Sequence, residues 1–159
     1  QAGEMKLAPN LSVGFFAQHQ LDDLVPNETP VDHVRRLMPL AGEAQVRARV
    51  AQMGLATEKM ATAAKDLSGG EKARLLMGLS AFHAPNLLIL DEPTAGLDPN
   101  QIRDVRKTIR TLGESKTILL STHILQEVEA MCNRVLFINE GRLVFEAAVE
   151  SANQISEGN

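Results

Sequence analysis

Hydrophobic residues in this chain fall into short continuous runs and into runs spaced three or four positions apart. The continuous runs lie at 11–18, 87–90 and 117–120, each followed by polar residues, which is typical of short β-strands. Apolar residues at helical spacing predict helices over 31–38, 43–53, 72–83, 102–112 and 124–132. Because 87–120 then forms a strand–helix–strand unit, the pattern predicts a parallel crossover and an α/β fold.

The segments around this unit complete the predicted architecture. Residues 29–84 contain no convincing strand pattern, so we expect a helical subdomain inserted between two strands of the sheet. Apolar residues at 135–138 and 143–145 flank a turn-forming segment at 139–141, which predicts a β-hairpin. In the first strand, the expected core residues are Val13, Phe15 and Phe16.

Composition narrows the classes of protein that fit. The 159 residues suffice for one domain, and 44% hydrophobic with 23% charged residues is typical of globular proteins. A net charge of −4 gives no direct signal for nucleic acid. The single cysteine, Cys132, excludes an internal disulfide and is expected to be an inert buried thiol. Since the chain begins at Gln1, we expect a piece of a longer protein.

Two carboxylates follow the apolar run at 87–90. Asp91 and Glu92 come directly after a predicted parallel strand, at the end where open α/β sheets bind ligands. One carboxylate can hold Mg²⁺ through its water shell, and the other can orient and deprotonate an attacking water. The alternative is an ordinary strand that ends in a turn.

Two further segments, 68–71 and 98–99, have the residues of a helix N-terminus. Ser68 and Glu71 fit a capping box, and the intervening Gly69 and Gly70 leave backbone N–H groups accessible to an anion at the helix N-terminus. Asp98 precedes a proline and is expected to cap the next helix. The basic residues of that helix, Arg103, Arg106, Lys107 and Arg110, are expected to form a solvated surface.

Taken together, these motifs resemble the nucleotide-binding domain of the ATP-binding cassette (ABC) superfamily. Residues 67–71 are similar to its signature motif, 87–92 to its Walker B strand and 95–98 to its D-loop. Residues 121–123 resemble its switch-histidine segment, and Gln18 stands where its Q-loop glutamine would be. The five motifs occur in the family order and span residues 11–145.

The resemblance implies a role for each matching residue. ATP and Mg²⁺ would be the ligands, with Asp91 as a metal-side carboxylate and Gln18 reaching the metal or the attacking water. Glu92 would be the general base and His123 a contact to the γ-phosphate. In a head-to-tail dimer with a second ABC domain, in cis or in trans, the residues acting across the interface would be Ser68, Gly69, Gly70 and Asp98.

One motif of the family is absent from the sequence. No glycine is followed by lysine, so the Walker A loop, which would cradle the phosphates, is missing. The chain therefore resembles a P-loop NTPase-like domain truncated before its Q-loop, with a partial parallel sheet flanked by helices. The expected segments are the Q-loop strand and loop at 11–28, the helical subdomain at 29–84, the catalytic motifs and hairpin at 85–147, and a frayed tail at 148–159.

Two functions follow from the resemblance. The first is Mg-ATP hydrolysis coupled to a conformational change of the dimer; the alternative is a non-catalytic interaction module that supplies its signature motif in trans. Residues 11–92 resemble ABC-F proteins, whereas 93–145 resemble transporter ATP-binding subunits, so a chimera is a further hypothesis. The partner would accordingly be a membrane permease or the ribosome, and the location cytoplasmic or peripheral to the inner membrane face.

Overall fold

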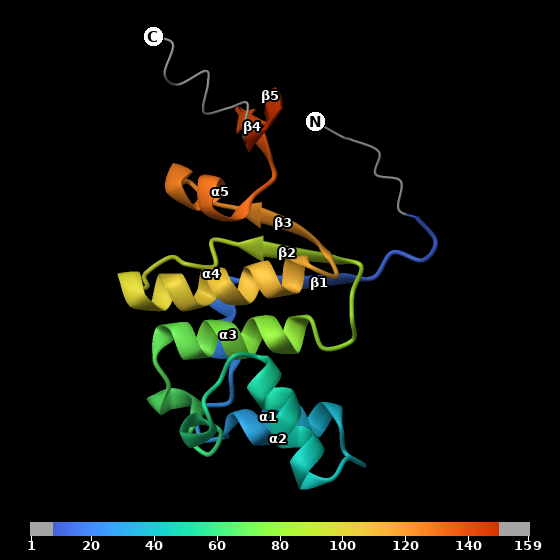
Figure 1. Ribbon diagram of the computed structural model, residues 1–159, viewed down its shortest axis with the longest axis vertical. Coiled ribbons are helices and arrows are strands. Elements are labelled where there is room, and N and C mark those ends of the chain that lie inside the picture. The colour runs from blue at the N-terminus through green and yellow to red at the C-terminus, as the bar shows by residue number, and fades with distance from the viewer. Residues whose placement is uncertain (1–7, 150–159) are drawn as a thin grey trace. The chain divides into compact units, whose positions relative to one another are not determined.

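The computed structural model describes residues 8–149. They divide into two compact units, of which the first ends at Ser121 and the second begins at Thr122 (Figure 1). The predicted frayed tail lies almost wholly outside the described residues.

A three-stranded parallel sheet organises the first unit. It consists of β1 (Val13–Ala17), β2 (Leu87–Asp91) and β3 (Thr117–Ser121), with β2 in the centre. The parallel pairing of β2 with β3, across the helix between them, confirms the crossover predicted from the hydrophobic runs.

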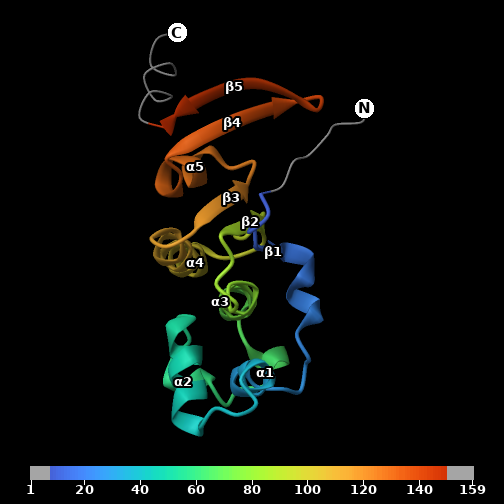
Figure 2. The same ribbon diagram turned by 90° about the vertical axis from the view of Figure 1, so that its right-hand side faces the viewer.

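Among residues 8–121, four helices and three short 3₁₀ turns accompany this sheet. The helices are α1 (Pro30–Leu37), α2 (Glu43–Gln52), α3 (Gly69–Ser80) and α4 (Pro99–Gly113). The 3₁₀ turns are η1 (Gln18–Asp23), η2 (Thr57–Lys59) and η3 (Ala64–Asp66). Helices α3 and α4 lie side by side beneath the sheet, with α1 and α2 beyond α3 (Figure 2).

The two faces of the sheet differ in burial. Phe16, Leu88 and Leu90 have no exposed surface, because they point from neighbouring strands toward α3 and α4. On the opposite face Val13, Phe15 and Leu119 are 48%, 47% and 49% exposed. Phe16 was therefore correctly predicted as core, whereas Val13 and Phe15 were not, since alternate strand residues point to opposite faces and only one face is covered.

A second apolar cluster holds the helical part of the first unit together. Val34 of α1, Val46 and Val50 of α2 and Leu75 of α3 are fully buried in it. The predicted helix over 43–53 is confirmed, and Gly54 ends it with a φ of +80°, a conformation that glycine adopts at no steric cost.

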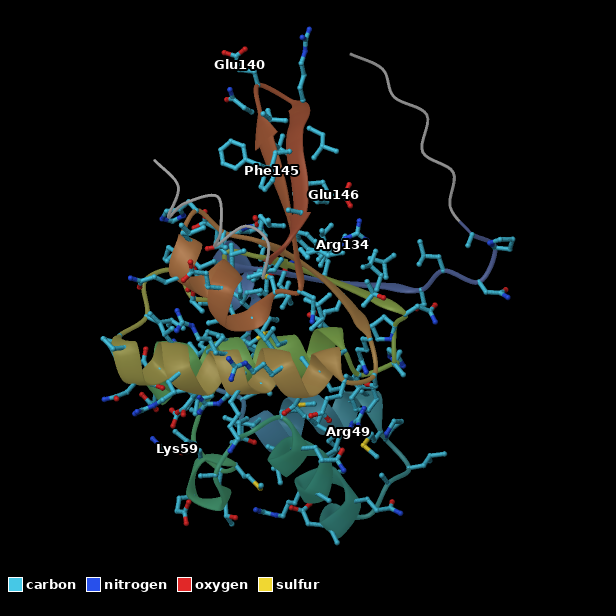
Figure 3. The ribbon with its side chains drawn as sticks, turned by 45° about the horizontal axis from the view of Figure 1, so that its top comes forward. Arg49, Lys59, Arg134, Glu140, Phe145 and Glu146 are labelled. Atoms are coloured by element: carbon cyan, nitrogen blue, oxygen red, sulfur yellow. The ribbon has the colours of Figure 1, made fainter. Side chains whose placement is uncertain are left out.

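The second unit contains a helix and an antiparallel hairpin. Its elements are α5 (Leu125–Met131), β4 (Arg134–Asn139) and β5 (Arg142–Ala148). Glu140 and Gly141 both have positive φ at the turn, as a two-residue hairpin loop requires, and Arg134 pairs with Glu146 across the strands (Figure 3). Among the described residues, no helix has the length and apolar character needed to cross a membrane.

Replacing Phe16 by alanine is expected to lower the free energy of unfolding by about 3–5 kcal/mol, because it removes a fully buried ring from the covered face. The same replacement at Phe15, one position away on the open face, is expected to lower it by about 1 kcal/mol or less. Urea unfolding followed by circular dichroism measures both changes. Equal losses at the two positions would contradict the assignment of the faces.

Candidate functional site

The register of the parallel sheet aligns the carboxyl ends of its strands. Ala17, Asp91 and Ser121 are paired in one row across β1, β2 and β3. The Ser121 hydroxyl donates a hydrogen bond to Asp91 Oδ1, and the Asp91 side chain is otherwise exposed. The row therefore fixes a carboxylate at the strand end while leaving it accessible.

Gln18 follows the same row on the first strand. It begins η1, which is anchored where the Ala17 N–H donates to Gln20 Oε1 at 2.9 Å. Gln18 Nε2 lies 3.9 Å from the position that a Cβ on Gly96 would occupy. The structure thus brings Gln18 next to the loop that follows Asp91 and Glu92, a proximity that the family resemblance implied and that the hydrophobic pattern did not indicate.

Glu92 has an unusual backbone conformation. Its φ is +46°, a left-handed value that non-glycine residues rarely adopt. The conformation is held because the Glu92 N–H donates to Ser121 O at 3.1 Å and Glu92 O accepts from the Ala95 N–H at 3.1 Å. Such strained residues cluster at functional sites, where surrounding contacts over-determine the backbone.

The predicted capping box at the start of α3 is confirmed. Ser68 Oγ accepts from the Glu71 N–H at 3.2 Å, and Glu71 Oε2 accepts from the Ser68 N–H at 2.8 Å. Lys59 Nζ lies 3.5 Å from Glu71 Oε1. Burial opposes ionisation, but hydrogen bonds from Ser68 and the charge of Lys59 hold the pKa of Glu71 below its ordinary value of 4.5.

The structure shows a second reason why positions 69 and 70 are glycines, which the capping pattern did not indicate. A Cβ on Gly69 would lie 2.9 Å from Leu97 Cδ2, and one on Gly70 would lie 2.9 Å from Gln101 Cβ. The two glycines therefore let the N-terminus of α3 approach the start of α4 closely. Leu97 and Gln101 are residues of this contact that sequence reasoning missed, because no local pattern reports how two helices meet.

Asp98 caps α4 as predicted. Its Oδ1 accepts from the N–H groups of Asn100 at 2.9 Å and Gln101 at 3.0 Å, and Pro99 occupies the first helical position. In Figure 1 the carboxyl ends of β2 and β3 and the N-terminal ends of α3 and α4 lie on the same side of the first unit. That side gathers Gln18, Asp91, Glu92, Asp98 and the segment 68–70.

His123 belongs to the second unit, just before α5. The unit is braced locally, because Thr122 Oγ1 donates to Glu127 Oε2 at 2.7 Å and accepts from the Ile124 N–H at 3.1 Å. Glu127 is buried, a role that its place in a short helix did not indicate. Burial, with the charge of Glu127, raises the pKa of the Cys132 thiol, which agrees with an inert thiol. Cys132 is half-buried, however, and not fully buried as predicted.

The donor chemistry at the strand end fits a magnesium ion. Mg²⁺ prefers oxygen ligands, keeps several waters, and is commonly bound through one or two carboxylates together with substrate phosphates. Asp91 presents one accessible carboxylate, oriented by Ser121. No group of three or more His, Cys, Asp and Glu side chains among residues 8–149 forms a dedicated metal cage, which such a site does not need.

Comparison with protein families identifies the chain. The sequence model of the family described as ABC transporter matches residues 4–95, more than half of the chain. The chain belongs to the ABC transporter family. This membership confirms the predicted resemblance to ABC ATP-binding domains and implies ATP as the nucleotide.

Curated ABC relatives share part of this domain. The chain is 43% identical over 97 residues to Probable ATP-binding protein YheS of Escherichia coli strain K12, covering 61% of this chain and 15% of that protein. It is 45% identical over 89 residues to Nod factor export ATP-binding protein I of Rhizobium johnstonii, covering 55% of this chain and 29% of that protein. The ABC chain thus spans less than a third of the length of either relative.

Solved ABC structures share the fold. The structure of CbiO1 from Clostridium perfringens superposes with a TM-score of 0.76 at 26% identity, covering 92% of this chain and 61% of that one. The ATP-binding cassette MJ0796 superposes with a TM-score of 0.66 at 18% identity, covering 87% and 63%. The predicted P-loop NTPase-like α/β fold of this ABC domain is confirmed by these similarities.

The low pKa of Glu71 predicts how stability depends on pH. Ionised Glu71 stabilises the fold above pH 4.5, and this contribution is lost as the pH falls through the lower pKa of the folded state. We expect Glu71→Gln to lower the midpoint of urea unfolding near neutral pH, and the difference from the unchanged chain to shrink at acid pH.

Glu58→Gln is the matched control for this measurement, since Glu58 is exposed and lies outside the capping box. It is expected to leave the midpoint near neutral pH unchanged. If the unfolding midpoint of Glu71→Gln is lowered by the same amount at every pH, the result would contradict the role of the Glu71 charge.

Proposed function

We propose that the chain supplies the hydrolytic half of an ATP-binding cassette that splits Mg-ATP by attack of water on the γ-phosphate. The observation that carries the proposal is the row of strand ends, where Ser121 holds Asp91 beside Glu92 and next to Gln18. Paired carboxylates at the carboxyl end of a parallel strand suit the metal and general-base roles of phosphoryl transfer.

Each residue of the proposed site has a separate task. Bound Mg²⁺ would neutralise charge on the phosphates. Asp91 would hold the metal, and Gln18 would reach the metal or orient the attacking water. Glu92 accepts a proton from that water, and its half-buried, backbone-constrained position supports an oriented base. His123 donates a hydrogen bond to the γ-phosphate.

The proposed functional state is a head-to-tail dimer with a second ABC domain. Ser68, Gly69 and Gly70 would then act on a nucleotide held by the partner, and Asp98 would contact the partner across the interface. Support comes from the similar cassette MJ0796, whose structure is described as dimeric, in a post-hydrolysis state and bound to ADP and Pi. The exposed position of Ser68 agrees with a role toward another chain.

A membrane permease is the proposed further partner, at the cytoplasmic face of the membrane. CbiO1 is described as part of the ABC transporter complex CbiONQ, and the Rhizobium relative is named for Nod factor export. Neither name mentions a ribosome, and the ribosomal alternative has no further support.

A second candidate function is supported by the signature segment. The segment 68–70 is fixed by its own capping box and by contact with Leu97 and Gln101, all within this chain. It is therefore preorganised without any P-loop, which this sequence lacks. The chain could then act as a non-catalytic module that lends its signature motif to a partner's nucleotide.

For the chain alone, we expect negligible ATP turnover and no micromolar binding of Mg-ATP in calorimetry, because no glycine–lysine loop cradles the phosphates. Circular dichroism in the same buffer checks that the chain is folded. Turnover by the isolated chain that Glu92→Gln abolishes would contradict this expectation and would favour a complete catalytic site.

Mixing the chain with an intact ABC domain tests the trans role. The partner would be CbiO1 with its own signature serine replaced, and we expect the chain to restore its ATP turnover. Ser68→Ala is expected to reduce the restored rate by about a hundredfold, as loss of one phosphate-directed donor does.

Thr29→Ala is the matched control for Ser68→Ala. Thr29 caps α1 with the same geometry, since its Oγ1 accepts from the Asp32 N–H at 3.2 Å, so both variants lose about 1 kcal/mol of capping. Only Ser68→Ala should reduce the restored rate. Equal effects of the two variants, or no restoration by the unchanged chain, would argue against a signature motif that acts in trans.

A further inference from the structure

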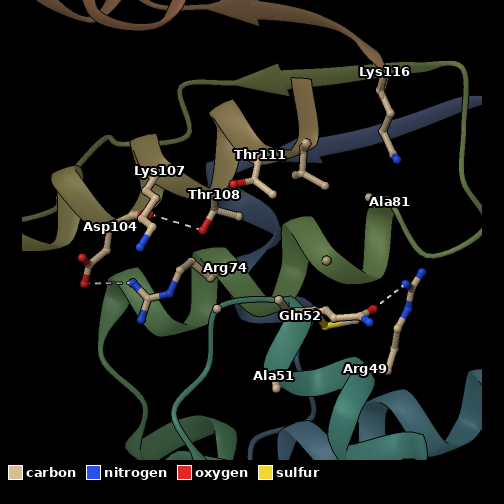
Figure 4. Close-up of a pocket in the computed structure, with 14 residues that line it drawn as sticks. Arg49, Ala51, Gln52, Arg74, Ala81, Asp104, Lys107, Thr108, Thr111 and Lys116 are labelled. Carbon is tan, nitrogen blue, oxygen red and sulfur yellow. Dashed lines mark hydrogen bonds and ion pairs between the residues drawn. The ribbon is translucent and has the colours of Figure 1, made fainter. Parts of the chain in front are cut away.

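A pocket of about 340 Å³ lies between helices α2, α3 and α4 of the first unit (Figure 4). Its walls come from the end of α2, from α3, from α4 and from the loop before β3. None of the residues assigned to the ATP site lines it. Its volume falls within the range of pockets that bind small molecules.

The lining of this pocket is strongly cationic. Arg49 of α2, Arg74 of α3, Lys107 of α4 and Lys116 before β3 all contribute to it, and Asp104 is the single acidic residue of the lining. The pocket thus has an excess of three positive charges in a chain whose net charge is −4. Gathering like charges from four segments is unfavourable unless an anion compensates them.

Arg74 is the most deeply placed of these cations. Its side chain is 11% exposed, and it lies 3.4 Å from the carboxylate of Asp104, which is itself largely exposed. Its Nε is buried and has no hydrogen-bond partner among the described residues. A buried guanidinium with an unused donor is costly, and an acceptor group of a ligand would satisfy it.

The cations stand at two ends of the pocket. Figure 4 shows Arg49 and Lys116 at one end, apart from each other, while Arg74 and Lys107 lie beside Asp104 at the other. Arg49 is held in place because it donates to Gln52 Oε1 at 2.9 Å and to Phe82 O at 3.1 Å. The Thr108 hydroxyl, which also lines the pocket, donates to the backbone oxygen of Asp104 at 3.2 Å.

We propose that this pocket binds an oligophosphate, a small molecule with several linked phosphate groups. Guanidinium groups bind phosphate oxygens in a two-pronged manner and lysines add point charges, so both cation types of the lining suit this ligand. About three negative charges on the ligand would match the excess of the pocket, and a chain of phosphates can reach both cationic ends.

Calorimetric titration of sodium tripolyphosphate into the 159-residue chain at physiological ionic strength tests the proposal. We expect one site with micromolar affinity. Lys107→Gln combined with Lys116→Gln should weaken binding by about tenfold or more, because each lost charge–phosphate contact is strong. Neither lysine is in the apolar core, and circular dichroism checks the fold of the variant.

Arg103→Gln combined with Lys65→Gln is the matched control. It removes the same charge from exposed positions of the first unit outside the pocket, and should leave the affinity within about twofold. Equal weakening by the two double variants, or no binding at all, would overturn the proposal.

Two further titrations test which chemical group is recognised and where the anion binds. Citrate carries similar charge on carboxylates, and binding as tight as that of tripolyphosphate would overturn the assignment to phosphate. Tripolyphosphate binding that Ser68→Ala abolishes and the pocket variant spares would place the anion at the signature segment instead. If the double lysine variant weakens tripolyphosphate binding and Ser68→Ala leaves it unchanged, the result would support the pocket independently of the proposed ATP site.

Discussion

The parallel pairing of β1, β2 and β3 is the constraint on which the rest of the first unit depends. Because the three strands run in one direction and in register, their carboxyl ends coincide, and Ala17, Asp91 and Ser121 fall in one row. A shift of one residue in the pairing of β2 with β3 would place Asp91 and Ser121 on opposite faces of the sheet, and a shift of β1 against β2 would take Ala17 out of the row. The hydrophobic contact of Phe16, Leu88 and Leu90 with the helices resists such a shift, so core packing and site geometry have a common origin.

The same sheet sets how the two helices beneath it meet. Helices α3 and α4 both cover the buried face, which forces their N-terminal ends together on the side of the strand ends. Gly69 and Gly70 permit this approach against Leu97 and Gln101. In consequence the start of α3 packs directly against Leu97 and the first turn of α4, and a displacement of α4 would be transmitted to Ser68 through direct contact rather than through a flexible loop.

Much of this arrangement was predictable from the sequence because local physics determines it. The runs at 87–90 and 117–120 and the caps at Ser68 and Asp98 depend on neighbouring residues alone, and the structure has them where they were predicted. The burial of Val13 and Phe15 was not predictable, since it depends on which face of the sheet is covered. The positive φ of Glu92, the approach of Gln18 to Gly96 and the contact of Gly70 with Gln101 also arise from distant segments. The roles of the motifs came from their resemblance to a family, not from the pattern itself.

The proposed ATP site and the pocket between α2, α3 and α4 differ in the charge of their side chains and therefore in the ligands that they require. At the strand ends, Asp91 and Glu92 are both acidic, whereas Gln18, Ser68, Gly69 and Gly70 contribute no formal charge. Nucleotide phosphates placed there would be repelled unless a metal ion and a cation from another polypeptide segment offset the carboxylates. In the pocket between α2, α3 and α4 the balance is reversed, because its cations need an anion rather than a metal. The proposed ATP site would therefore need cationic groups that this sequence does not supply there, while the pocket has its positive charge within this chain.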